Sequence, residues 1–308
     1  MPNRNAQSEI VVGVDGSASA TAAVRWAAGD AKLRRVALRL VNVVAPVSDT
    51  NASPWVGVSA RADRARFTMG KYNARQILDS AYTAAIDVLS SHPEFPIHTG
   101  ILTGLPVPAL ADYSKHAAML VVGCRGRRRF SRALFGSVSS GLVHHASCPL
   151  AVIHDDESIA RPKGPVVVGI DGSPASEAAF QIAFDEASRR SADLIAMHAW
   201  SDEGPVSFGR PGHAPIEWAN FQAEEEEILA ERLAGWGARY PDVSVHRVVV
   251  ADRPVHRLLE FAERAQLLVV GSHGHSRFTD VLHHSVSSAV ATGAQIPVIV
   301  AHSPHNAA

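Results

Sequence analysis

The sequence predicts an α/β protein of two tandem domains, each an open parallel sheet with helices on both faces. In the first half of the 308 residues, short runs rich in Val and Ile alternate five times with segments of helical periodicity. These strand candidates are apolar almost throughout, which is typical of strands buried on both faces. The sequence motifs of the first half begin again near residue 165, so the same fold is expected twice.

The expected elements of the first half follow one another in close order. An apolar strand at residues 10–14 ends on Asp15-Gly16-Ser17, and Ser17 or Ser19 can cap the helix that follows. Residues 46–65 are rich in Ser, Pro, Asn and Gly, which favours a long loop that acts as a lid or in interactions. The remaining elements are strands at 36–44, 97–102, 119–122 and 150–153, and helices at 67–91, from Pro106 or Pro108, and at 137–145.

The second half repeats the motifs of the first half in the same order. Residues 167–173 repeat residues 11–17 at an offset of 156 (171 − 15), and residues 268–274 repeat 120–126 at an offset of 148 (271 − 123). The polar segment 154–165 has the composition of a linker. We therefore expect one domain over residues 1–157 and another over residues 158–308, with the second loop shortened at 201–214.

The overall composition excludes several classes of protein. A formal net charge of −1 gives no reason to expect binding to nucleic acid or to an acidic membrane. The two cysteines are too few for a disulfide framework, and no apolar run reaches the length of a membrane span. The polar N-terminus lacks the apolar core of a signal peptide, so a cytoplasmic location is expected.

The glycine-rich segment after the fourth strand is the strongest functional signal. Its spacing is G-x2-G-x9-G-S, with Gly123, Gly126, Gly136 and Ser137. A glycine loop that leads into a helix N-terminus presents backbone N–H groups and a positive dipole end, which suit a phosphate chain. If the first and fourth strands are neighbours, Asp15 lies beside this loop, although Asp15 alone would be interpreted as a turn or cap residue.

Other nucleotide motifs are absent from the sequence. It contains neither the G-x-x-x-x-G-K-[ST] loop nor a strand-linked G-x-G-x-x-G. Without a lysine in the phosphate loop, a fast hydrolase is not expected.

Taken together, these motifs resemble the ATP-binding class of the universal stress protein family. The resemblance covers nearly the whole chain as two tandem copies. It implies a Rossmann-like, adenine nucleotide alpha hydrolase-like fold with five parallel strands, and a nucleotide bound near the ends of strands one and four. It further implies ATP as a ligand, with Mg²⁺ accompanying the phosphates, and a homodimer.

The resemblance also carries site residues onto the first copy. Asp15 and Val43 match adenine contacts, Gly104 lies on the ribose side, and the glycine loop with the helix start binds phosphate. The complete set expected for the first copy is Gly13, Asp15, Val43, Gly104, Gly123, Gly126, Arg127, Gly136, Ser137, Val138 and Ser139.

The second copy departs from the pattern at two positions. His284 stands where the third glycine of the loop is required, and Asp252 replaces the glycine that matches Gly104. The second site is therefore expected to be weaker, unless a protonated His284 pairs with phosphate instead. The matching residues that remain suitable there are Gly169, Asp171, Ala199, Gly271, Gly274, Ser285, Val286 and Ser287.

Three further groups of residues allow more than one interpretation. Five arginines from Arg125 to Arg132 could neutralise phosphates, or could be the solvated face of a loop. Cys124 beside them could be a redox sensor, but a plain loop residue is favoured, because the second copy has Ser272 there. Adjacent histidines such as His283 and His284 point apart on a helix, so no structural zinc is expected.

Three functions follow from these observations. The first is an ATP-binding protein of the stress response that uses the nucleotide as a regulatory ligand and is not an enzyme. The second is a dimeric interaction scaffold with relic sites, and the third is a slow ATPase, which the lack of an evident general base disfavours. The sequence indicates no particular protein partner.

Overall fold

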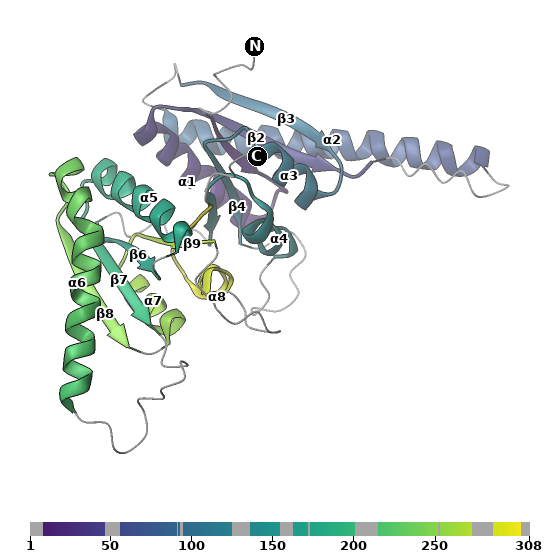
Figure 1. The fold of residues 1–308 in the computed structure, drawn as a ribbon. Helices are drawn as coiled ribbons and strands as arrows, with labels where there is room; N and C mark the ends of the chain where they lie inside the picture. Colours follow the sequence, from purple (N-terminus) through teal and green to yellow (C-terminus); the bar gives the residue numbers. More distant parts are fainter. Residues whose placement is uncertain are drawn as a thin grey trace, which may run out of the picture. The chain divides into compact units, whose positions relative to one another are not determined.

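The computed structural model describes residues 9–46, 56–90, 92, 95–124, 136–154, 163–171, 173–200, 215–251, 253–272 and 286–302. The chain forms two compact units, Met1–Asp156 and Glu157–Ala308 (Figure 1). Strands and helices alternate in both units, as the sequence predicts, and the strands within each unit pair in parallel.

Five parallel strands make the sheet of the first unit, in the order β3-β2-β1-β4-β5. Gly13, the last residue of β1, lies opposite Val41 of β2 and Val122 of β4. The strand order reverses beside β1, and ligands of open α/β sheets bind beyond the carboxyl ends at such a point. The strands are β1 (Glu9–Gly13), β2 (Ala37–Val44), β3 (Ile97–Thr103), β4 (Met119–Gly123) and β5 (Leu150–Ile153).

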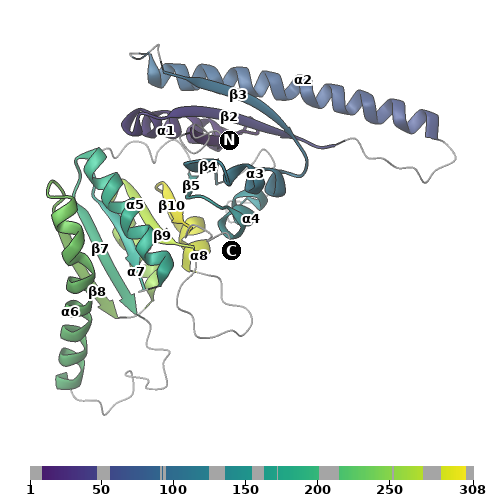
Figure 2. The ribbon, with the colours of Figure 1, turned by 45° about the horizontal axis from the view of Figure 1, so that its top comes forward.

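Four helices cover the two faces of this sheet (Figure 2). Helices α1 (Ala18–Arg34) and α2 (Val56–Leu89) pack against each other on one face, and α3 (Pro106–Ser114) and α4 (Ser137–His145) pack on the other. The inner strands β1 and β4 are mostly buried, as are Leu38 and Leu40 of β2, which explains their apolar sequences, whereas β3 at the edge has no fully buried residue.

Local chemistry fixes the start of α1. The Ser17 hydroxyl accepts a hydrogen bond from the backbone N–H of Ala20 at 3.2 Å, so Ser17, and not Ser19, is the N-cap. The helix ends at Arg35, whose φ of 56° is left-handed.

Helix α2 begins earlier than the sequence analysis predicted. It starts at Val56, whereas a loop was expected up to residue 65. Pro54 is the last proline of that segment, and residues 60–66 contain only Ala, Arg and Asp, so most of them favour a helix. Composition alone therefore placed the helix start about three turns too late.

The second unit repeats the same topology, with parallel strands in the order β8-β7-β6-β9-β10. Its strands are β6 (Val166–Ile170), β7 (Leu194–Trp200), β8 (Val245–Ala251), β9 (Leu267–Gly271) and β10 (Val298–Ala301). Helices α5 (Pro174–Arg190) and α6 (Pro215–Arg239) lie on one face, and α7 (Pro254–Ala262) and α8 (Val286–Gly293) on the other.

The two units differ in the packing between the first two helices of each. In the second unit, Phe184 of α5 stacks on Trp236 and Tyr240, with ring centroids 5.4 Å apart in both pairs. Phe180 also lies against Trp236, at 6.4 Å. The first unit has Val24 and Ala28 at the positions of Phe180 and Phe184 (offset 156), so its corresponding helix carries smaller side chains.

Candidate functional site

The residues expected to bind a nucleotide in the first unit follow neighbouring strands. Gly13 ends β1 and Gly123 ends β4, and the two strands pair in parallel. The turn with Asp15 and the start of the glycine loop therefore lie together at one edge of the sheet. This is the arrangement that the sequence analysis required.

Asp15 shapes its own turn. One of its carboxylate oxygens accepts a hydrogen bond from the backbone N–H of Ser17 at 2.9 Å, and the side chain is half-buried. Gly16 follows with a φ of 80°, a left-handed conformation that glycine adopts without strain. The second unit repeats this turn, since Asp171 accepts from the N–H of Ser173 at 3.0 Å.

Asn42 supports this turn from β2. Its side-chain nitrogen donates to the carbonyl oxygen of Val14 at 2.7 Å, and the residue is buried. In the second unit, a ring nitrogen of His198 lies 3.2 Å from the carbonyl oxygen of Ile170. The sequence analysis did not identify Asn42, although a polar residue inside an apolar strand at the same place in both copies was the available signal.

Gly123 is required by packing. A Cβ atom at this position would lie 2.6 Å from the backbone carbon of Ser19 and 2.8 Å from the backbone nitrogen of Ala20. The N-terminus of α1 therefore rests directly on the end of β4. The glycine spacing predicted the close approach of a ligand at Gly123, whereas the contact with α1 is by itself sufficient to exclude a side chain.

The two ends of the glycine loop are joined by hydrogen bonds. The backbone N–H of Gly136 donates to the carbonyl oxygen of Cys124 at 2.9 Å. Ser139 is only 1% exposed. Its hydroxyl oxygen lies 3.1 Å from the carbonyl oxygen of Cys124 and 2.9 Å from that of Gly136. Any contact of Ser139 with phosphate would therefore come from its backbone N–H.

Gly136 is the N-cap of α4, and no side chain makes a capping hydrogen bond there. Ser137 and Val138 occupy the first turn, where backbone N–H groups point out of the helix end. Gly126, Arg127 and the other arginines of this loop lie outside the described residues.

The remaining candidates of the first copy lie at the same edge of the sheet. Val43 is half-buried near the end of β2, and Gly104 directly follows β3 with a φ of 151°. The backbone N–H of Gly104 donates to the carbonyl oxygen of Val44 at 3.0 Å, which holds the start of α3 against β2.

In the second unit, Asp171 follows β6, and Gly271 ends the neighbouring strand β9. A Cβ atom on Gly169 would lie 3.0 Å from the side chain of Leu258. The equivalent atom on Gly13 would lie 3.2 Å from the side chain of Leu110. Ala199 lies in β7, and Val286 and Ser287 begin α8. Asp252, Gly274, His284 and Ser285 lie outside the described residues, so the expected weakness of this site remains a prediction.

Both cysteines are buried, and neither forms a disulfide bond. Cys124 is 2% exposed, and burial raises the pKa of the Cys148 thiol to about 12. Over the described ranges, no three His, Cys, Asp or Glu side chains gather as a metal site would require, and His273, His275, His283 and His284 are not among these residues. Likewise, no helix of the described segments is long and apolar enough to cross a membrane.

The sequence profile of the Universal stress protein family matches residues 8–154 and again residues 164–302. The chain belongs to the universal stress protein family. Both copies of the repeat are matched, so it is a tandem, two-domain member, and the resemblance stated from the sequence is confirmed.

Other universal stress proteins align with the chain over nearly its full length. One from Mycobacterium bovis is 51% identical over 306 residues, which cover 97% of this chain and 96% of the relative. One from Mycobacterium tuberculosis is 44% identical over 303 residues, or 98% of each chain. A solved universal stress protein structure from Archaeoglobus fulgidus has a TM-score of 0.67 at 19% identity, covers 96% of this chain and 98% of its own, and supports the α/β fold alone.

Proposed function

We propose that the first unit binds ATP and that the nucleotide acts as a regulatory ligand in a stress response. The observation that carries this proposal is the junction of β4 and α4. There a helix N-terminus whose N-cap is Gly136 stands at a strand end next to the Asp15 turn. Backbone N–H groups at such an end favour a phosphate chain, and the absence of a capping side chain leaves room for it.

Each part of this edge would have a distinct task. The first turn of α4 and the glycine loop would receive the phosphates, with Mg²⁺ accompanying them. Asp15 would accept hydrogen bonds from the adenine or ribose, because its carboxylate is held at the neighbouring strand end by the N–H of Ser17. Val43 would contact the adenine base, and Gly104 would lie on the ribose side.

Regulation is favoured over catalysis because the glycine loop contains no lysine for phosphoryl transfer. Slow hydrolysis of ATP and a scaffold with relic sites are the alternatives. A homodimer, which the family resemblance implies, and a cytoplasmic location belong to the same proposal.

Calorimetry with ATP on a matched pair of variants tests the proposal. Gly126→Glu places a charged side chain in the phosphate loop of the first copy and should abolish binding, while Gly274→Glu in the second copy should leave binding nearly unchanged. About one ATP should bind per chain. Unchanged affinity in Gly126→Glu would refute the site, and two equal sites per chain would refute the asymmetry.

Two further measurements separate the alternatives. Mass spectrometry of the ligand released from the purified protein identifies the nucleotide. Release of phosphate at about 1 per second or faster would make the protein an enzyme and not a regulator.

A further inference from the structure

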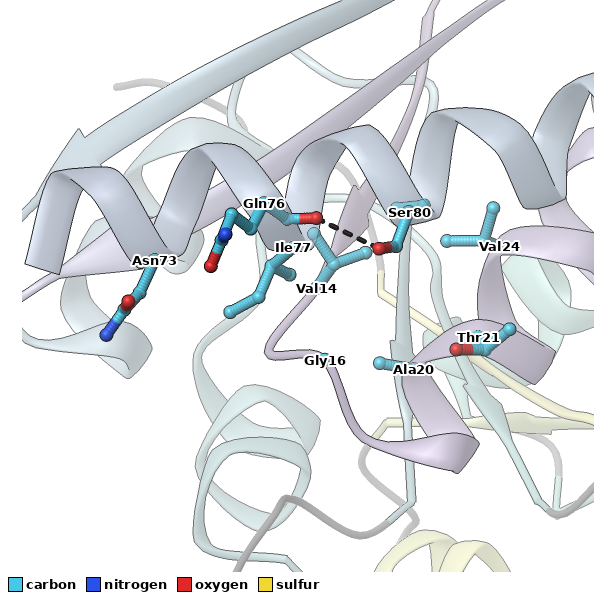
Figure 3. A pocket seen from close by; sticks show the side chains of 10 residues that line it. Val14, Gly16, Ala20, Thr21, Val24, Asn73, Gln76, Ile77 and Ser80 are labelled. Carbon is cyan, nitrogen blue, oxygen red and sulfur yellow. Dashed lines mark hydrogen bonds between the residues drawn. The ribbon is translucent and has the colours of Figure 1, made fainter.

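A pocket of about 320 Å³ lies between α1 and α2 of the first unit, against the turn that joins β1 to α1 (Figure 3). Its apolar part is formed by buried residues, among them Val14, Val24 and Ala81. The exposed polar side chains of Gln76 and Ser80 lie along its opening on α2. The pocket thus combines an apolar floor with a polar rim, and its size is at the lower end for small-molecule sites.

This pocket is separate from the proposed nucleotide site. Val14 lines it from the face of the sheet that α1 and α2 cover. Gly13, the preceding residue, is directed to the other face, where a Cβ would lie 3.2 Å from Leu110 of α3. Neither Asp15 nor Val43 lines the pocket, so a ligand there would not occupy the adenine position.

The second unit carries larger side chains at two of the lining positions. Val24 corresponds to Phe180 (180 − 24 = 156), and Ala81 corresponds to Leu229 (229 − 81 = 148). Phe180 is 0% exposed and Leu229 is 2% exposed, so both fill interior space in their unit. The small residues that leave the pocket open are therefore specific to the first copy of the repeat.

The lining residues indicate which class of ligand the pocket can bind. None of the ten lining residues carries a charge, which disfavours an ion as the occupant. The Thr21 hydroxyl donates to the carbonyl oxygen of Ser17 at 3.2 Å, and the Ser80 hydroxyl donates to that of Gln76 at 3.0 Å. Since both hydroxyl protons are used within the helices, both oxygens are left to accept hydrogen bonds from a ligand.

We propose that this pocket binds an uncharged, ring-bearing small molecule that donates hydrogen bonds. The ring would lie on the apolar floor, and its N–H or O–H groups would reach the hydroxyl and amide oxygens of the rim. The proposal does not depend on the proposed function, because the pocket shares no lining residue with the proposed ATP site.

The test uses the full chain and two probes of similar size and shape, indole-3-acetamide and indole-3-acetate, of which the second is charged and lacks the amide N–H donors. Saturation-transfer NMR, with and without excess ATP, should detect the amide with a dissociation constant of about 1 mM or below. The acetate should bind at least about tenfold more weakly. Because the pocket is distinct from the nucleotide site, ATP should not displace the amide.

Two variants locate the binding and one controls for the substitution. Ser80→Leu and Ala81→Leu both fill the pocket, and each should weaken the amide by about tenfold or more. Ser80 is exposed, so its variant should fold normally even if Ala81→Leu does not. Thr83→Leu, exposed on the same helix but not among the lining residues, should bind as the unchanged protein does.

Three results would overturn the proposal: no binding of the amide, equal binding of the acetate, or unchanged affinity in Ser80→Leu. Failure of ATP to bind would leave it intact and would count against the proposed function alone.

Discussion

The Ser139 hydroxyl donates a hydrogen bond to the carbonyl oxygen of Cys124 at 3.1 Å. In the second unit, the Ser287 hydroxyl donates to the carbonyl oxygen of Ser272, also at 3.1 Å. In each unit, this bond connects the residue after a central strand to the first turn of the helix that follows the loop. The two ends of the loop are therefore held together by the same interaction in both copies.

Replacement of Ser139 by Ala should destabilise the first unit. It leaves buried carbonyl oxygens with one donor fewer, at a cost of about 1–3 kcal/mol in the free energy of unfolding. Ser287→Ala should cost a similar amount in the second unit, as measured by denaturant unfolding. Only Ser139→Ala should also weaken ATP binding, and equal loss of ATP affinity in both variants would contradict the proposed asymmetry.

Two glycine substitutions test the contact between β4 and α1. Gly123→Ala should lower the free energy of unfolding by about 2 kcal/mol or more, because the added methyl group meets the backbone of Ser19 and Ala20. In Gly29→Ala of α1, the added methyl group has no atom within 4 Å. This variant should raise the free energy of unfolding by about 0.5–1 kcal/mol. Thermal unfolding of the two variants distinguishes them, and a tolerated Gly123→Ala would contradict the close approach.

Two substitutions of Asn42 test its hydrogen bond to Val14, and one of them introduces the histidine that the second unit has at this place. Asn42→Leu removes the donor to the buried carbonyl oxygen of Val14 and should cost about 1–3 kcal/mol of stability. Asn42→His restores a nitrogen that can donate, as His198 provides in the second unit, and should recover part of this loss. Equal unfolding midpoints for the two variants would show that the hydrogen bond contributes nothing.

The thiols should be inert in the folded protein. Both side chains are buried, and the pKa of Cys148 is about 12 instead of its ordinary 9.0, so little thiolate is present at pH 8. An aromatic disulfide reagent should therefore react with neither cysteine until the chain is unfolded. Rapid labelling of Cys124 in native protein would revive its interpretation as a redox sensor.

The same pKa shift predicts a dependence of stability on pH. Because the pKa of Cys148 is higher in the folded chain, the folded state favours the protonated thiol. Its contribution is fully present below about pH 9 and is lost as the pH rises toward 12. Denaturant unfolding across this range should show a smaller decline in Cys148→Ala than in the unchanged protein.

Sequence patterns predicted most of the fold because buried parallel strands are distinct in composition. The runs at residues 10–14 and 119–122 were identified as strands, and the repeat at Asp171 and Gly271 predicted the second unit. The predicted start of α2 was wrong, because Gly57 and Ser59, which favoured a loop, lie inside the helix.

The candidate site was predictable only where its residues lie in a motif. The Asp15 turn and the start of α4 follow from spacing along the chain. The contact of Gly123 with Ser19 does not, because it joins residues about a hundred positions apart and depends on how a helix rests on the sheet. The support that Asn42 gives to Val14 was missed for the same reason.

Gly16 stands at the boundary of both proposed sites. A Cβ on this residue would lie 3.1 Å from Ile77 of α2, which lines the α1–α2 pocket, while its neighbour Asp15 belongs to the proposed nucleotide site. A displacement of this turn by one ligand would therefore be felt by the other, and the two affinities would change by the same factor. The protein would then respond to two chemical signals, a neutral metabolite and a nucleotide, through a single turn of the chain.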